Sequence, residues 1–358
     1  MSTPKKINLA LQGGGSHGAF AWGVLDALLE DERIEIEALS GASAGAMNAV
    51  VLADGYAEGG RDGARTKLRA FWHGLAESSQ ASSLIRGPWE ALMGGWSLDS
   101  SPLYLWLDML SRVASPYDLN PLNWNPVRDL LTKHVDFKKL RTMEGPGLFV
   151  TATNVETGRA RVFTRQELTE DHVMASSCLP LLFQAVMIQG KPYWDGGYMG
   201  NPSLWPLYDN AVSNDILIVQ INPITRKGVP KTSRDILNRL NEISFNSSLL
   251  SELRAIDFVK RLIAAGRLEG TNYQDILVHI IEDDKLMSPL GESSKFLVEK
   301  PFLDMLFESG RKAARSWLKA HYDDLGQRAT VDLRAYFGAA PEDGLDRHPA
   351  EPAPPAPS

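Results

Sequence analysis

Two glycine-rich turns near the start of the chain constrain its fold more than any other feature. The first, within INLALQGGGSHGAFAWGVLDALL, follows an apolar strand-like segment at residues 7–11 and begins a helix predicted over residues 16–30. The second, within SGASAGAMNAVVLA, follows a strand predicted over residues 36–39 and begins another helix. A strand–helix–strand unit is right-handed and its strands are usually neighbours, so both turns are expected at the carboxyl ends of adjacent parallel strands.

The rest of the chain continues this alternation of strand-like and helix-like segments. Further strands are predicted at GLFVTATNV, RARVFT, AVMIQ, DILIVQINP and ILVHII. The segment DILIVQI is nearly all apolar, which is typical of a strand covered on both faces. The pattern therefore predicts an α/β protein, with a three-layer α/β/α fold and a mostly parallel central sheet.

We predict a single domain over residues 1–338, with helical additions at 84–135 and 232–325, and a disordered Pro/Ala-rich tail at 339–358. Residues 84–125 hold four of the nine tryptophans and fit either core packing or a lid or acyl-chain surface. Residues 232–264 predict one long amphipathic helix that begins with a capping-box spacing. We assign its apolar stripe to the core: Ile236, Leu240, Ile243, Leu250, Leu253 and Ile256.

The composition excludes several kinds of partner and site. The net charge of −7 argues against a nucleic-acid partner, which needs a clustered basic surface. The single cysteine, Cys178, excludes an internal disulfide and a cysteine-based zinc site, and it favours a reducing compartment. No apolar run approaches the roughly 18 residues of a membrane span, and the N-terminal run is too short for a signal peptide. We expect a soluble, cytoplasmic protein with peripheral contact at the inner membrane surface.

The first glycine turn fits a dinucleotide fingerprint, but its context does not. Gly13, Gly15 and Gly18 satisfy the G-x-G-x-x-G spacing. A dinucleotide site also needs an acidic residue at the end of the second strand, about 20 residues further on. Glu35 and Glu37 lie near that distance, but the second glycine turn occupies the position itself. Dinucleotide binding therefore stays as an alternative hypothesis.

The second turn has the G-x-S-x-G spacing of a nucleophile elbow. A serine on a sharp strand-to-helix turn needs small residues two positions before and after it, and Gly41 and Gly45 flank Ser43 in this way. The start of the following helix favours developing negative charge beside the serine. If the first turn lies next to the second, its backbone N–H groups form an oxyanion hole above Ser43.

A serine hydroxyl needs a base to take its proton. The chain has seven histidines, but none is placed by a motif as a triad member, and only His17 lies in a glycine turn. Asp195, in GKPYWDGGYMGNP, follows a strand-like stretch and precedes two glycines. An Asp-Gly pair alone is more often an ordinary hairpin turn. Beside a glycine loop and an elbow, we interpret it as a site residue.

Together these motifs resemble the patatin-like phospholipase family, of the bacterial lipid acyl hydrolase type. The chain carries GGGSHG, GASAG and DGG in the family's order, and ASSCLPLLFQAV and NPSLWPL resemble the segments that flank the aspartate. The resemblance covers residues 7–222, and residues 223–338 resemble nothing that we can name. The family often has Arg or Lys where this chain has His17.

The resemblance implies a serine lipid acyl hydrolase, acting as a phospholipase A or lysophospholipase on a lipid or fatty-acyl ester, without a metal or a cofactor. Ser43 would be the nucleophile and Asp195 the base that orients it. The alternatives are an acyltransferase or thioesterase on the same site and a non-catalytic lipid-binding protein. The residues implied for the oxyanion hole are Gly13, Gly14, Gly15 and Ala44. Those implied as motif support are His17, Gly18, Gly41, Gly45, Gly196 and Gly197.

Overall fold

The computed structural model describes residues 3–79, 95–99, 101, 106, 109–110 and 114–337. In this part of the chain, eight strands form one sheet. The strands are β1 (Lys5–Leu11), β2 (Ile34–Gly41), β3 (Gly147–Asn154), β4 (Ala160–Thr164), β5 (Val186–Ile188), β6 (Lys191–Asp195), β7 (Asp215–Val219) and β8 (Leu277–Ile281).

The sheet is mostly parallel, as the sequence predicts. Its strands pair in the order β5-β6-β3-β2-β1-β7-β8, and β4 also pairs with β3. All pairs among β1, β2, β3, β7 and β8 are parallel. The pairs that involve β4, β5 and β6 are antiparallel. The parallel strands therefore place the two glycine turns side by side, because β1 and β2 are direct neighbours.

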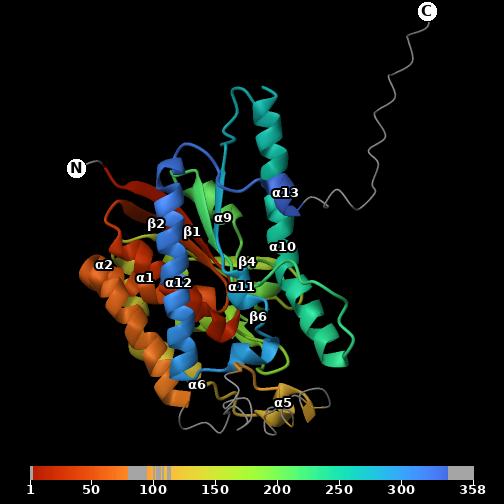
Figure 1. Cartoon of the computed structure of the whole chain (residues 1–358). Coiled ribbons are helices and arrows are strands. Elements are labelled where there is room, and N and C mark those ends of the chain that lie inside the picture. The colour runs from red at the N-terminus through yellow and green to blue at the C-terminus, as the bar shows by residue number, and fades with distance from the viewer. Residues whose placement is uncertain are drawn as a thin grey trace, which may run out of the picture.

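Helices cover both faces of the sheet, so the predicted three-layer fold is confirmed. Figure 1 shows α1, α2 and α12 on one side and α9, α10 and α13 on the other. No helix in the described part of the chain combines the length and hydropathy of a membrane span. The α-helices are α1 (Gly18–Glu30), α2 (Ala44–Ser79), α5 (Pro116–Leu119), α6 (Pro126–His134), α7 (Phe137–Thr142), α8 (Glu170–Ser176), α9 (Trp205–Asn210), α10 (Ser233–Ala264), α11 (Asp284–Met287), α12 (Lys300–His321) and α13 (Leu333–Phe337). The short 3-10 helices are η1 (Gly15–His17), η2 (Arg165–Glu167), η3 (Gly196–Tyr198), η4 (Glu292–Phe296) and η5 (Tyr322–Asp324).

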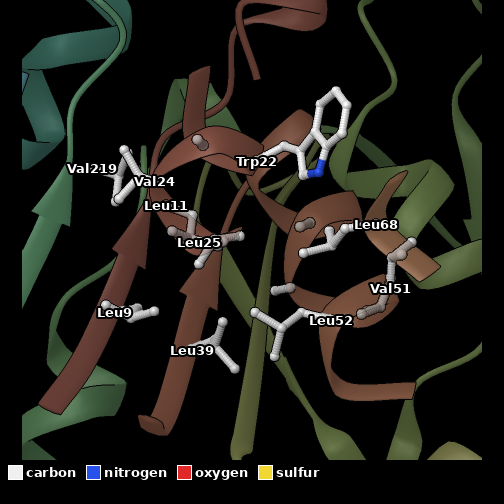
Figure 2. Close-up of a cluster of buried hydrophobic side chains, with 14 of the residues drawn as sticks. Leu9, Leu11, Trp22, Val24, Leu25, Leu39, Val51, Leu52, Leu68 and Val219 are labelled. Carbon is white, nitrogen blue, oxygen red and sulfur yellow. The ribbon is translucent and has the colours of Figure 1, made fainter. Parts of the chain in front are cut away.

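The larger core lies between the sheet and helices α1, α2 and α12. Leu9, Leu11 and Leu39 from the strands are buried there with Leu25 of α1 and Leu52 of α2. Figure 2 shows these side chains between the strands and the two helices. Full burial of one such side chain is worth about 1.5–3 kcal/mol, so this layer holds both strand-to-helix turns firmly in place.

Helix α12 packs directly on α1 because each helix has a glycine at the contact. A Cβ on Gly23 would lie 2.0 Å from the carbonyl oxygen of Phe307, and one on Gly310 would lie 2.1 Å from that of Phe20. A side chain at either position would force the helices apart. A segment beyond the region of family resemblance is thus part of the main core.

The long helix α10 corrects one expectation. Thr232 caps it by accepting from the Asp235 N–H, as predicted. Its second half packs on the sheet, and Leu253 and Ile256 are buried as expected. In its first half, however, the side chains expected in the core are 42–54% exposed: Ile236, Leu240 and Ile243.

The physical reason is that polar groups occupy the inward face of this first half. Glu242 is buried and pairs with Arg226, and buried Asn246 accepts a hydrogen bond from Gln12. These partners belong to the loops around the first glycine turn. The apolar side chains of this half, Ile236, Leu240 and Ile243, therefore point outwards, and the described chain covers them only in part.

Half of the tryptophan-rich segment and all of the predicted disordered tail lie outside the described residues. Of the four tryptophans, Trp89 is not described. Trp96 packs against Phe302 of α12, with ring centroids 5.2 Å apart. Trp106 and Trp124 are more than half exposed. Among its described residues, the segment therefore contributes Trp96 and Leu98 to the core and Trp106 and Trp124 to the surface.

Candidate active site

Ser43 occupies the sharp turn between β2 and α2. Its φ is 53°, a left-handed conformation that is uncommon for residues other than glycine. Such backbone strain costs about 1–3 kcal/mol and persists only where the surroundings enforce it. Here the Ser43 N–H donates to both the carbonyl and the hydroxyl oxygen of Ser176, at 3.1 and 3.0 Å. The side chain stays partly exposed and can meet a ligand.

The glycines around Ser43 let the backbone segments approach closely. A Cβ on Gly41 would lie 2.6 Å from the backbone of Gly45. A Cβ on Gly45 would lie 2.1 Å from the carbonyl oxygen of Leu11, at the end of β1. Gly41 and Gly45 are therefore required for steric reasons, as the G-x-S-x-G spacing predicts. Gly45 also lets the second glycine turn pack against the end of β1, the strand that precedes the first glycine turn.

Gly45→Ala is expected to destabilise the protein by about 3 kcal/mol or more, because the new methyl group meets a backbone oxygen that cannot move aside. Gly59→Ala is the matched control. Gly59 lies in the same element at a kink, with φ −151° and open space around it. Chemical denaturation of both variants measures the difference. Equal stability of the two would contradict the close approach at Gly45.

Strand register brings Asp195 to the same place. Gly41, the last residue of β2, pairs with Val150 of β3. Asp195, the last residue of the antiparallel strand β6, pairs with Ala152. Strand β4 pairs with both of these β3 residues from the opposite edge, so β2 and β6 lie end to end along one edge of β3. The two strands point towards each other, and their ends carry Ser43 and Asp195.

The Asp195 carboxyl group is fully buried and only partly paired. Oδ1 accepts from the Gly197 N–H at 2.7 Å, whereas Oδ2 has no hydrogen-bond partner within the described chain. The Asp195 N–H donates to the Cys178 carbonyl, and the Asp195 carbonyl accepts from the Thr153 hydroxyl, both at 2.8 Å. The backbone is thus fixed while one carboxyl oxygen is left for another partner.

Burial raises the pKa of the Asp195 carboxyl to about 7. The Gly197 N–H, the Ser43 side chain and the positive charge of Lys295 lower this pKa, in that order, without cancelling the effect of burial. The Ser43 hydroxyl therefore acts on the carboxyl group, although the contact falls short of full hydrogen-bond geometry. Catalytic hydrogen bonds are often long in unliganded proteins and tighten when a ligand binds.

The glycine-rich loop lies directly against Ser43. A Cβ on Gly13 would lie 2.6 Å from the Ser43 Cβ, so only glycine fits at this position. The Gly13 N–H does not face a ligand, however, because it donates to Asn201 Oδ1 at 2.6 Å. This donor is engaged, contrary to the expectation that all three glycine amides face the serine.

Three other amides of the predicted oxyanion hole remain available. Within the described chain, no hydrogen-bond acceptor is found for the N–H groups of Gly14, Gly15 or Ala44. Ala44 is the first residue of α2, where N–H groups have no partner inside the helix and the helix dipole favours negative charge. The three amides and Ser43 belong to two adjacent turns.

Comparison with known protein families assigns the chain. The family model described as patatin-like phospholipase matches residues 9–208, which is more than half of the 358 residues. The chain belongs to the patatin-like phospholipase family. It is therefore an ester-bond hydrolase, and the family match favours this function over dinucleotide binding.

Two solved structures are similar to this patatin-like phospholipase. VipD from Legionella pneumophila is 15% identical with a TM-score of 0.44, over 89% of this chain and 68% of that one. A chain in the complex of full-length SpcU with full-length ExoU from the type III secretion system of Pseudomonas aeruginosa is 17% identical, with a TM-score of 0.32. That match covers 88% of this chain and 54% of the other. Curated protein sequences give no match.

His17 of this patatin-like phospholipase is a neutral side chain. It is buried, and its Nε2 lies 2.8 Å from the Ser294 hydroxyl oxygen. Burial first, and then the charges of Lys295 and Arg226, lower the pKa of His17 to about 3. The loop residue therefore carries no positive charge at neutral pH. Gly18, next in the chain, allows α1 to pack on α2, because a Cβ there would lie 2.8 Å from that of Ala44.

The buried pair of His279 and Asp215 is remote from Ser43. His279 Nε2 lies 2.9 Å from Asp215 Oδ1, and its Nδ1 lies 3.0 Å from the Thr330 hydroxyl oxygen. Asp215 is the first residue of β7, so it lies at the amino ends of the parallel strands, whereas Ser43 lies at the carboxyl ends. This pair therefore does not form a triad with the serine.

Several site residues of this family member carry no motif and were missed in the sequence. Ser176, the last residue of α8, binds the Ser43 N–H, and the carbonyl of Cys178, just after this helix, binds the Asp195 N–H. Asn201 and Asn222 bind the two polar groups of Gly13, with Asn222 donating to its carbonyl at 2.7 Å. Lys295 approaches the loop from η4. Single polar residues in loops give no sequence signal of such roles.

Proposed function

We propose that the chain is a serine lipid acyl hydrolase of the phospholipase A or lysophospholipase type, which works through a Ser43–Asp195 dyad and an acyl-enzyme. One observation carries the proposal: a strained, partly exposed serine faces a buried carboxyl group with one unpaired oxygen. Strained backbone and an unsatisfied buried carboxylate both carry a cost, and they cluster where chemistry requires them.

The reaction we propose has two halves. The Ser43 Oγ attacks the ester carbonyl carbon while Asp195 takes the hydroxyl proton. The carbon–oxygen bond to the alcohol then breaks, the proton passes to the leaving alcohol, and the acyl group stays on Ser43. Water attacks the acyl-enzyme in the second half, losing a proton to Asp195, and the fatty acid leaves as Ser43 regains a proton.

The oxyanion formed in each half needs hydrogen-bond donors. We assign this role to the N–H groups of Gly14, Gly15 and Ala44, and we leave out Gly13 because its N–H is bound to Asn201. Each such donor contributes about 2.7–4 kcal/mol to the transition state. A pKa of about 7 also makes Asp195 a better base than an exposed aspartate, whose pKa is near 3.9.

Covalent labelling and product analysis test this proposal together. A fluorophosphonate probe should label Ser43 and no other serine, as read by peptide mass spectrometry. Phospholipid or lysophospholipid should yield free fatty acid. Transfer of the acyl group to an added alcohol in preference to water would instead support the acyltransferase alternative, and turnover of acyl thioesters alone would support a thioesterase.

We also propose that the protein docks peripherally on a lipid surface beside this site, and we keep the expectation of a cytoplasmic location. The supporting observation is a group of exposed apolar side chains, here called the apolar rim. It comprises Tyr117, Leu119, Leu122, Trp124, Leu181, Leu182, Ile236, Leu240 and Ile243.

The apolar rim comes from three segments that border the site. Helix α10 reaches the active site through Phe245, whose ring packs on Gly197 beside Asp195. The segment after Cys178 is bonded to the α5 region, since Gln184 donates to the Asn120 carbonyl. Figure 1 shows α5 and the first turns of α10 at the lower end of the view. Exposed apolar groups next to a lipid hydrolase site suit contact with acyl chains.

The double variant Leu240→Asp/Ile243→Asp is expected to lose about tenfold or more of its activity on phospholipid vesicles, because two apolar anchors become charged. Hydrolysis of a soluble short-chain ester should change less than about twofold, since neither residue is assigned to the dyad or the oxyanion hole. Val212→Asp is the control, because Val212 is 82% exposed and lies before the amino end of β7, opposite the site. Equal vesicle activity of all three proteins would exclude docking through α10.

A further inference from the structure

Lys295 is joined to the glycine-rich loop through its backbone. A Cβ on Gly15 would lie 2.3 Å from the Lys295 carbonyl oxygen, so η4 lies directly on η1. The neighbouring residue Ser294 strengthens this contact, because its carbonyl accepts from the Ser16 hydroxyl at 2.8 Å. Lys295 lies outside residues 9–208, which the family model matches. Helix η4, which lies outside the residues that the family model matches, therefore packs on the glycine-rich loop and fixes its position.

The Lys295 side chain extends towards both parts of the site. Its Nζ donates to Asn222 Oδ1 at 3.0 Å and to Glu292 Oε1 at 2.6 Å. Asn222 in turn holds the Gly13 carbonyl. The same Nζ lies 5.9 Å from the centroid of the Phe245 ring, which packs against the turn after Asp195. The ammonium group is thus one side chain away from the loop and one from the aspartate turn.

Lys295 carries the positive charge that acts on Asp195 of the dyad. Burial raises the pKa values of Cys178 and Tyr198, which border Asp195, to about 12, so both are neutral near pH 7. His17 is neutral as well, because its pKa is lowered to about 3.

The other charges near the loop leave Lys295 as the group that shifts Asp195. Arg226 forms an ion pair with Glu242, and Lys295 forms one with Glu292. Among the charged groups of the described chain, it is the positive charge of Lys295 that lowers the pKa of Asp195.

We propose that Lys295 is a positioning residue of the hydrolytic reaction, which holds the glycine-rich loop through Asn222 and supplies a fixed positive charge beside the Ser43–Asp195 pair. This inference rests on the proposed function, since it concerns the same dyad. The charge keeps Asp195 ionised, and so able to accept a proton, at a lower pH than burial alone would allow. It also favours the negative charge that develops on the substrate oxygen.

The test is the pH profile of kcat/KM on a soluble short-chain ester, which reports the ionisation of the free enzyme. In the wild type the activity should rise with pH through about 7, the pKa of Asp195. In Lys295→Met this rise should move up by about 1 pH unit, so that kcat/KM at pH 6 falls about tenfold. Lys295→Arg should restore the wild-type profile, since it keeps the charge.

Glu292→Gln is the matched control. It breaks the same ion pair as Lys295→Met but keeps the positive charge, so its activity should rise at the wild-type pH or below it. Lys295→Gln, which keeps a donor for Asn222 but no charge, replaces Lys295→Met if that variant does not fold. Wild-type profiles in the folded uncharged variants would overturn the role of Lys295.

The failure of the two proposals can be told apart. If the wild type neither hydrolyses esters nor reacts with a fluorophosphonate at Ser43 at any pH, the proposed function itself fails. If the wild type is active and Lys295→Met has the same pH profile, only the positioning role fails. Equal shifts in Lys295→Met and Glu292→Gln would also overturn it, because the ion pair rather than the charge would then be responsible.

Discussion

Ser43→Ala is expected to abolish ester hydrolysis, with a loss of kcat of about 10⁴-fold or more, while the protein stays folded. Removal of the nucleophile leaves only the weak catalysis that the amides and substrate binding supply. Folding should be unaffected, because the described chain gives the Ser43 hydroxyl no hydrogen bond of full geometry and its N–H still binds Ser176. Steady-state kinetics and circular dichroism of the purified variant measure both effects.

Ser43→Gly separates strain from chemistry. Glycine adopts a φ of 53° without the steric cost that serine and alanine carry at this position. Ser43→Gly should therefore be equally inactive but at least as stable as Ser43→Ala in thermal unfolding. Turnover by either variant near the wild-type rate would show that another group is the nucleophile.

Asp195→Asn is expected to lower kcat by about 10⁴-fold while making the protein more stable above neutral pH. The activity falls because an amide cannot accept the Ser43 proton. The amide oxygen can still accept from the Gly197 N–H, which now binds Oδ1. Kinetics at pH 8 measure the first effect, and chemical denaturation at several pH values measures the second. Near wild-type turnover would leave the base unidentified.

The sign of the stability effect follows from the raised pKa. The folded protein binds a proton at Asp195 up to about pH 7, whereas the unfolded chain releases it near pH 3.9. Between these values the folded state holds more protons, so the contribution of Asp195 to stability falls as pH rises. Asp195→Asn removes this fall. Its gain over the wild type should therefore be absent below pH 4 and reach its full size, a few kcal/mol at most, above pH 7.

The features that the sequence predicted well are those that depend on a few consecutive residues. The G-x-S-x-G spacing requires small residues on both sides of Ser43, and the close approaches at Gly41 and Gly45 agree with this rule. The strands and the parallel order of β1 and β2 follow from apolar runs and the handedness of the connection. Such signals are local, so they can be read without the rest of the molecule.

The features that were missed depend on residues far apart in the chain. The first half of α10 has a regular apolar stripe, and periodicity alone assigns it to the core. Its polar residues face inwards instead, because Glu242 and Asn246 meet partners from the glycine-loop region. The N–H of Gly13 was likewise expected to face a ligand, but Asn201 reaches it from another loop.

The sequence by itself therefore determined the fold class, with helices on both faces of a mostly parallel sheet, as well as the sharp turn at Ser43 and the family. Those properties come from steric limits and hydrogen-bond spacing within single turns and strands. Only the tertiary structure decided that β6 and β2 meet end to end, that burial lowers the pKa of His17 far below its usual value, and that Lys295 reaches the glycine-rich loop from η4. Register between distant strands, burial and electrostatic coupling act through space, and no short stretch of residues encodes them.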